Sequence, residues 1–144
     1  MATHKLHAPM LTIPAHTAII GGGPGGLTLA RLLQQRGFNV TVYERDETPD
    51  ARQQGATLDL HEDSGLKALK AAGLIDEFLK HYRPGADKIK VTDETAAVLF
   101  SDHDEPGEED ISSPYFRPEI DRGPLRNILV NSLKPVPFNG TASL

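Results

Sequence analysis

Three glycines in one short run are the residues whose spacing points most directly to chemistry. Gly21, Gly23 and Gly26 form the pattern Gly-x-Gly-x-x-Gly after an apolar run and before a helical pattern. In a dinucleotide-binding turn, the first glycine permits a tight turn, the second lets the backbone approach a pyrophosphate, and the third lets the helix pack closely. The helix start offers free N–H groups to phosphates. This context favours a nucleotide site over a glycine turn without a ligand.

An acidic residue follows at the distance expected of a ribose ligand. Glu44 ends the next apolar run, at the offset of roughly 20 residues that is typical of this position. A carboxylate there can accept hydrogen bonds from both ribose hydroxyls, and it repels a 2′-phosphate. The pocket therefore favours FAD or NAD over NADP. The alternative, a surface glutamate paired with Arg45, explains the spacing less well.

Two further segments leave their role open when judged by residue type alone. Arg52, Gly55 and Asp59 lie within RQQGATLDLH and could bring backbone and a carboxylate against a ring system. A turn followed by an exposed strand explains the same residues better.

Two arginines in EIDRGPLR form the second of these segments. Arg122 and Arg126 lie one helical turn apart and suit an anionic or planar ligand. Surface pairing with Glu119 and Asp121 fits equally well.

Several classes of site and partner are disfavoured by composition. The 144 residues include no cysteine, which excludes disulfides and thiolate chemistry, and the six histidines show no metal-ligand spacing. His103 stands in an acidic stretch that we interpret as a solvated loop. A net charge of −5 argues against a nucleic-acid partner. The sequence shows neither a signal peptide nor a membrane-spanning run, so we expect a cytoplasmic protein without membrane contact.

The elements that must position these residues follow an α/β order. The pattern predicts a buried parallel strand at 16–21, a helix after the glycine turn that ends at Gly37, and a strand at 38–43. Within that helix Leu29 is expected to widen the apolar face. The fold class is therefore α/β, a Rossmann-like FAD/NAD(P)-binding βαβ domain. Further along we expect a short strand at 57–60, helices at 61–72 and 74–82, and strands at 88–92 and 97–101. A last helix should begin after Asp121.

Four segments in continuous order resemble the class A flavin-dependent monooxygenases, and among them the tetracycline-inactivating hydroxylases. These segments are AIIGGGPGGLTLARLLQQRG, VYERD, ARQQGATLDLH and RPEIDRGPLR, and the similarity covers about residues 16–134. The resemblance implies FAD as the cofactor, NADPH as the co-substrate, and oxygenation of a small organic substrate of aromatic or polyketide-like type.

The resemblance also implies roles for particular residues. Gly21, Gly23 and Gly26 would bind the FAD pyrophosphate and Glu44 the ribose. Arg45 would lie near the adenine and Arg52 would contact NADPH. Asp59, Arg122 and Arg126 match positions that contact or face FAD. No catalytic residue and no metal ligand is assigned.

The resemblance covers only the N-terminal part of the family's longer chains, and this limits the function that we expect. Members of this family are much longer, and no Gly-Asp-Ala motif follows residue 126. We expect a flexible lead-in at 1–14, the N-terminal part of an FAD-binding domain at 15–134, and an irregular tail at 135–144. The chain should bind FAD without independent turnover and should self-associate through an exposed sheet edge. The alternatives are an NAD-dependent oxidoreductase domain and a non-enzymatic nucleotide-binding fragment.

Overall fold

The computed structural model describes residues 16–46, 55–105, 110–111, 113, 115–135 and 139–140. Its elements are, in chain order, β1 (Thr17–Ile20), α1 (Pro24–Gln35), β2 (Val40–Glu44), β3 (Thr57–Asp59), α2 (Gly65–Ala72), α3 (Ile75–Phe78), β4 (Lys90–Thr92), β5 (Val98–Ser101), β6 (Glu119–Asp121), α4 (Arg122–Ser132) and β7 (Asn139–Gly140). Each helix and strand expected between residues 16 and 133 is present, with ends shifted by a few residues.

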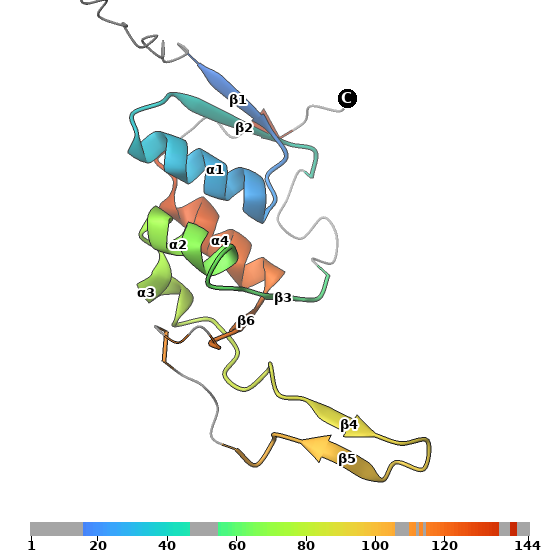
Figure 1. The fold of residues 1–144 in the computed structure, drawn as a ribbon. Coiled ribbons are helices and arrows are strands. Elements are labelled where there is room, and N and C mark those ends of the chain that lie inside the picture. The colour runs from blue at the N-terminus through green and yellow to red at the C-terminus, as the bar shows by residue number, and fades with distance from the viewer. Residues whose placement is uncertain are drawn as a thin grey trace, which may run out of the picture.

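A parallel β1–α1–β2 unit forms the top of the molecule in Figure 1, with α1 against one face of its sheet. Strands β1 and β2 pair in register from Thr17 with Val40 to Ile20 with Tyr43. Gly37 follows α1 with φ +82°, a conformation that glycine adopts without strain, and so ends the helix as expected. The βαβ interpretation is confirmed.

The β1–α1–β2 unit differs from the expectation at two places. Only Ile19 of β1 is buried, whereas Ile20 is 67% exposed, because no described element covers the face opposite α1. Leu29 points away from the core and is 48% exposed, so it does not widen the buried face of α1.

The third strand of this sheet, β7, lies in the segment expected to be an irregular tail. It pairs in parallel with β2 through Tyr43 with Asn139 and Glu44 with Gly140. Pairing of this kind uses backbone groups of a free strand edge and does not need the apolar pattern by which a strand is recognised in a sequence.

Helices α1, α2 and α4 pack together beneath the sheet and share one core (Figure 1). Its fully buried side chains include Leu27, Leu66, Phe78, Ile120 and Leu129. Ser64 and Asp121 occupy the N-cap positions of α2 and α4, but neither side chain makes a capping hydrogen bond. The apolar faces, rather than the caps, therefore hold these helices in place.

Polar contacts join the C-terminal ends of the three helices. Arg31 of α1 donates from Nη1 to the carbonyl oxygen of Ser132 at 2.8 Å and from Nε to that of Ala72 at 3.4 Å. Gln34 Oε1 accepts from the backbone N–H of Lys134 at 3.0 Å. The two bonds from Arg31 use carbonyls that a helix end leaves free, and the bonds to Ser132 and from Lys134 fix α4 beside α1.

Two antiparallel pairs complete the fold. Strand β3 pairs with β6, from Thr57 with Asp121 to Asp59 with Glu119. Strands β4 and β5 form the expected hairpin, with Val91 opposite Phe100. The carboxylate of Asp93 closes the hairpin turn, accepting from Thr95 N at 2.9 Å and Ala97 N at 2.9 Å. Across the described part of the chain, no helix combines the length and apolar character that crossing a membrane requires.

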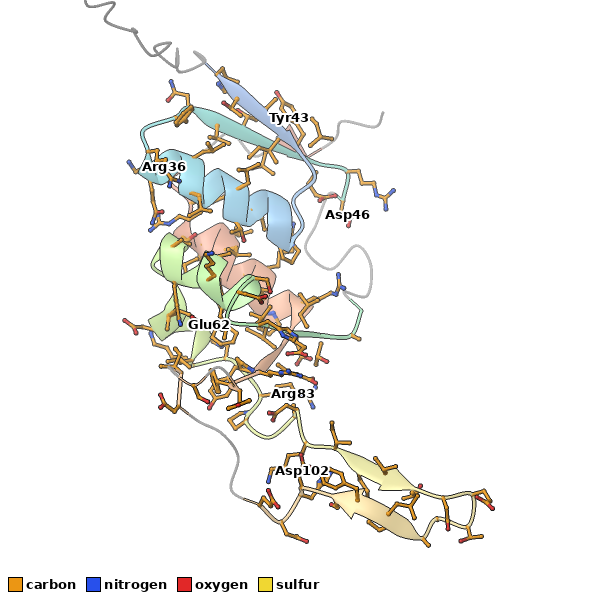
Figure 2. All side chains as sticks on the ribbon, viewed as in Figure 1. Arg36, Tyr43, Asp46, Glu62, Arg83 and Asp102 are labelled. Carbon is orange, nitrogen blue, oxygen red and sulfur yellow. The ribbon has the colours of Figure 1, made fainter. Side chains whose placement is uncertain are left out.

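The β4–β5 hairpin reaches away from the helices, with Asp102 at its base (Figure 2). Its apolar side chains are exposed: Ile89, Val91, Val98, Leu99 and Phe100. A two-stranded hairpin with both edges free is marginally stable in water and is prone to pair with another chain. Among the described residues, the β4–β5 hairpin therefore offers free strand edges in addition to the free edge of β1.

We expect the purified chain to self-associate and Leu99→Lys to weaken that association, because the substitution places a charge on the exposed apolar surface. Sedimentation velocity over a range of protein concentrations measures the effect. Thr92→Lys adds the same charge to the hairpin without removing apolar surface and should change association less. Equal behaviour of the two variants and the parent chain would contradict the expectation.

Candidate functional site

The turn between β1 and α1 is shaped by its glycines. Gly21 adopts φ +109°, and its N–H donates to the carbonyl oxygen of Tyr43 at 2.7 Å, which extends the parallel ladder by one bond. A Cβ on Gly26 would overlap the carbonyl oxygen of Gly21. Glycine at both positions lets the helix begin directly against the end of the strand.

The N-terminus of α1 carries free backbone donors. Gly23 is the N-cap residue, and α1 has neither a side-chain cap nor an acidic residue in its first turn. Pro24 has no N–H to satisfy, whereas the N–H groups of Gly23, Gly25 and Gly26 precede the first intrahelical bond, which Leu27 donates to Gly23 at 3.0 Å. Such a set of donors favours an anion.

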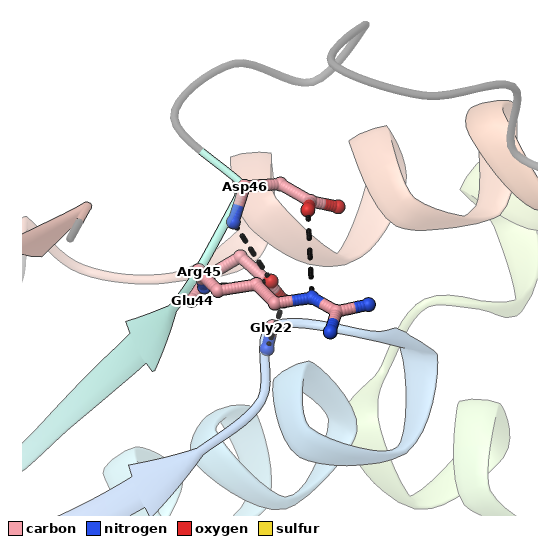
Figure 3. Close-up of polar contacts among 4 residues, drawn as sticks. All are labelled: Gly22, Glu44, Arg45 and Asp46. Atoms are coloured by element: carbon pink, nitrogen blue, oxygen red, sulfur yellow. Dashed lines mark hydrogen bonds and ion pairs between the residues drawn. The ribbon is translucent and has the colours of Figure 1, made fainter. Parts of the chain in front are cut away.

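Glu44 lies beside this turn at the end of β2 and is 9% exposed. Its Oε2 accepts from Gly22 N at 2.7 Å, and its Oε1 accepts from Arg45 N at 2.8 Å and Asp46 N at 3.1 Å (Figure 3). Burial by itself would raise the pKa of Glu44. The three backbone donors, with the positive charge of Arg126, outweigh burial and hold that pKa below its ordinary value.

The sequence alone does not identify Gly22 as a functional residue, because the pattern Gly-x-Gly-x-x-Gly leaves its position variable. Its Cα lies so close to β2 that an added Cβ would stand 3.1 Å from Cβ of Glu44. The signal that could have identified it is its place in the middle of three consecutive glycines, GGG.

The two arginines of α4 have different surroundings. Arg126 is 8% exposed, and its Nε donates to the carbonyl oxygen of Gly22 at 3.3 Å. Arg122 is exposed and lies beside Gly55. Asp121, one of the two acids considered as their surface partners, pairs instead with Arg83 at 3.4 Å.

The remaining candidates lie at the margin of this group. The Arg45 side chain is 71% exposed, and its Nε lies 3.8 Å from Oδ1 of Asp46 (Figure 3). Asp59, on β3, pairs instead with His61 at 3.0 Å. Arg52 lies outside the described residues. In the part of the chain that is described, no cluster of three or more His, Asp or Glu side chains could hold a metal ion.

The structure therefore brings Gly21, Gly23, Gly26, Glu44 and Arg126 together at the carboxyl ends of β1 and β2. Arrangements of this kind, with helix donors beside a strand-end carboxylate, bind nucleotides in open α/β sheets.

We expect Gly26→Ala to destabilise the chain by about 1–3 kcal/mol, because the new methyl group must displace the Gly21 carbonyl. Gly25→Ala is the matched control, since nothing lies within 4 Å of its Cβ position; it should be neutral or stabilise by about 0.5–1 kcal/mol. Urea denaturation followed by circular dichroism measures both. Equal midpoints for the two variants would contradict the close approach of α1.

Replacing Glu44 should remove a pH-dependent part of stability. Its pKa is lower in the folded chain than in the unfolded chain, so its contribution is complete above the ordinary glutamate pKa. The contribution is lost as pH falls through the lowered pKa of the folded state. At neutral pH, Glu44→Gln should cost about 1–3 kcal/mol, because an amide has one acceptor oxygen where Glu44 uses two.

Urea denaturation from neutral to acidic pH tests this expectation, with Glu62→Gln as the control for loss of one exposed carboxyl. The difference between the parent chain and Glu44→Gln should shrink towards acidic pH. A difference that stays constant over that range would rule out the proposed role of ionised Glu44 in stability.

Comparisons with known proteins agree with this geometry. Residues 14–120 match the family model described as an FAD binding domain. Monooxygenase asqM from Emericella nidulans is 40% identical over 121 residues, which cover 81% of this chain and 25% of the relative. Monooxygenase penA from Penicillium thymicola is 39% identical over 121 residues, covering 81% of this chain and 26% of the relative.

Solved structures show the same fold. Tetracycline destructase Tet(55) superposes with a TM-score of 0.65 at 24% identity, over 88% of this chain and 30% of that structure. The Y270A variant of 2-methyl-3-hydroxypyridine-5-carboxylic acid oxygenase gives 0.59 at 26% identity, over 82% of this chain and 28% of that structure. The chain spans about a quarter of the length of the relatives that it matches. It belongs to the FAD-binding monooxygenase family and corresponds to the N-terminal portion of its members.

Proposed function

We propose that this chain binds the ADP half of FAD at the carboxyl ends of β1 and β2, as part of an NADPH-dependent monooxygenase that hydroxylates a small organic substrate. The observation that carries the proposal is the contact between Glu44 and Gly22 at 2.7 Å, beside the uncapped start of α1. It sets a carboxylate suited to a ribose next to donors suited to a pyrophosphate, in the order in which ADP presents these groups.

The donors at the turn fit a diphosphate. The N–H groups of Gly23, Gly25 and Gly26 have no intrahelical partner, and the missing side chains leave the backbone accessible. Pro24 at the first helical position sets the backbone for the helix without adding a donor. In the proposed pyrophosphate cradle, Gly21 makes the turn out of the strand and Gly23 and Gly26 supply donors.

The acceptor capacity of Glu44 fits a ribose. Oε2 receives one hydrogen bond, from Gly22, so one of its lone pairs remains for a ribose hydroxyl. Because the lowered pKa keeps Glu44 ionised at neutral pH, a 2′-phosphate would be repelled. Arg45, exposed beside this acid, is proposed to lie near the adenine.

The other positions are proposed from the family resemblance. Asp59 on β3 and Arg122 at the start of α4 would face the remainder of FAD, and Arg52 would contact NADPH. When bound and reduced by NADPH, FAD would supply the activation of O₂ by which one oxygen atom enters the substrate. The protein's part is to bind, orient and shield the cofactor.

The substrate class is proposed from relatives. The hydroxylase from Klebsiella pneumoniae named for 3-(3-hydroxy-phenyl)propionate and 3-hydroxycinnamic acid is 36% identical over 76 residues. An aromatic or polyketide-like substrate is consistent with that name. Because the chain spans only about a quarter of the length of the matched monooxygenases, we propose that it binds FAD without turning over NADPH by itself.

Titration of the purified chain with FAD, ADP and FMN, followed by calorimetry or by flavin fluorescence, tests the proposal. FAD and ADP should bind and compete, and FMN, which lacks the adenosine half, should not. Glu44→Gln should weaken FAD and ADP about tenfold, corresponding to the loss of roughly one charged hydrogen bond. Glu62→Gln, which removes an exposed carboxyl of the segment before α2, is the control and should bind normally.

Three outcomes would contradict the proposal. Binding of NAD in preference to FAD, measured in a parallel titration with NAD, would favour an NAD-dependent oxidoreductase domain. Oxidation of NADPH with incorporation of oxygen into an aromatic substrate by the isolated chain would refute the proposed lack of independent turnover. Absence of binding to any of the three nucleotides would overturn the FAD assignment.

A further inference from the structure

Gly22 is held through both of its polar backbone atoms. Its N–H donates to Oε2 of Glu44 at 2.7 Å, and its carbonyl oxygen accepts from Nε of Arg126 at 3.3 Å. Glu44 ends β2 and Arg126 lies in α4, so three elements far apart in the sequence meet at one glycine. All three residues are buried.

These two bonds fix two successive peptide planes. A trans peptide is planar, with its C=O and N–H on opposite sides. The bond from Gly22 N–H to Glu44 therefore orients the plane shared by Gly21 and Gly22. The bond from Arg126 to the Gly22 carbonyl orients the plane shared by Gly22 and Gly23, and it turns the Gly23 N–H away from Arg126.

Orientation matters here because glycine restrains its own backbone least of all residues. Gly21, Gly22 and Gly23 are consecutive, so their peptide planes need an outside partner to hold one direction. Gly23 is also the N-cap of α1 and has no side chain that could cap the helix. Its N–H is one of the donors at the proposed pyrophosphate cradle.

We propose that Arg126 is a positioning residue, whose Nε holds the Gly22 carbonyl so that the Gly23 N–H is aimed at the FAD pyrophosphate before the cofactor arrives. The proposal rests on the proposed function of the cradle. It differs from direct binding by the arginine, because the atom that acts is Nε and its target is the protein backbone. Preorganised donors bind more tightly because less ordering accompanies binding.

The geometry of α4 supports this role. Bonds from Arg31 and to Gln34 tie the C-terminal end of α4 to α1, and Arg126 ties the N-terminal half of α4 to the turn that precedes α1. Helices α1 and α4 are thereby joined near both ends. Arg126 is held by a rigid element rather than by a loop.

Two substitutions separate the hydrogen bond from the charge. Glutamine places its amide Nε2 on Cδ, where arginine carries Nε, so Arg126→Gln keeps a donor towards Gly22 and loses the charge. Lysine places a methylene at that position, so Arg126→Lys keeps the charge and loses the donor. We expect Arg126→Lys to weaken FAD and ADP about tenfold, as for one lost hydrogen bond, and Arg126→Gln to weaken them less than about threefold.

Salt dependence provides a second readout. A direct ion pair with a phosphate is screened by salt, whereas a bond within the protein is not. The change in Kd for ADP between low and high ionic strength should therefore be the same in the parent chain and in Arg126→Gln. The opposite order of affinities, equal losses in both variants, no loss in Arg126→Lys, or a smaller salt effect in Arg126→Gln would overturn the proposal.

Amide hydrogen exchange in the nucleotide-free chain tests the positioning role without any cofactor. Loss of the Arg126 bond to the Gly22 carbonyl should let Gly22 move, so that its N–H bond to Glu44 opens more often. The Gly22 N–H should therefore exchange faster in Arg126→Lys than in the parent chain, and its rate in Arg126→Gln should be near that of the parent. Amides within α4 serve as the control for global folding, and their rates should not change.

This readout distinguishes the proposed FAD site from the positioning role of Arg126. A chain that binds no nucleotide but shows the expected exchange would refute the FAD site and retain the role of Arg126. Unchanged exchange at Gly22 in both variants would refute the role of Arg126.

Discussion

The close approach of α1 to the end of β1 is the constraint on which the rest of the site depends. It requires that Gly26 lack a side chain, because a Cβ there would occupy the position of the Gly21 carbonyl. Once the helix starts at that point, its free N–H groups lie beside the carboxyl ends of the parallel strands. The buried carboxylate of Glu44 can then bond to Gly22. A charged acceptor in that place is tolerated because three backbone donors offset its loss of water.

The helical layer does more than cover one face of the sheet. Helix α4 brings Arg126 to the glycine turn at one end and is tied to Arg31 and Gln34 at the other. A residue about a hundred positions away in the chain thus controls the backbone of the turn. The backbone orientation of the glycine turn therefore depends on a helix that lies outside the β1–α1–β2 unit.

Several exposed apolar side chains lie on strands. Ile20 on the open face of the sheet and Leu99 and Phe100 on the β4–β5 hairpin are each more than half exposed. Antiparallel pairs commonly bury one of their faces, and parallel strands commonly bury both. Strands with this composition gain stability from a covering layer, and the described part of the chain supplies that layer to one face of the β1–β2 sheet.

Local patterns in the sequence determined the order of elements, the glycine turn, the acid at the end of β2 and the helix stop at Gly37, because each depends on residues close together in the chain. The tertiary structure decided what depends on distant partners. It buried Arg126 and left Arg122 exposed, although the two share a helix and a residue type. It exposed Leu29 and Ile20 despite their apolar character, and it paired two residues of the tail with β2. Above all, it gave Gly22 a role, because the atoms that hold this residue come from β2 and α4, and only folding brings them together.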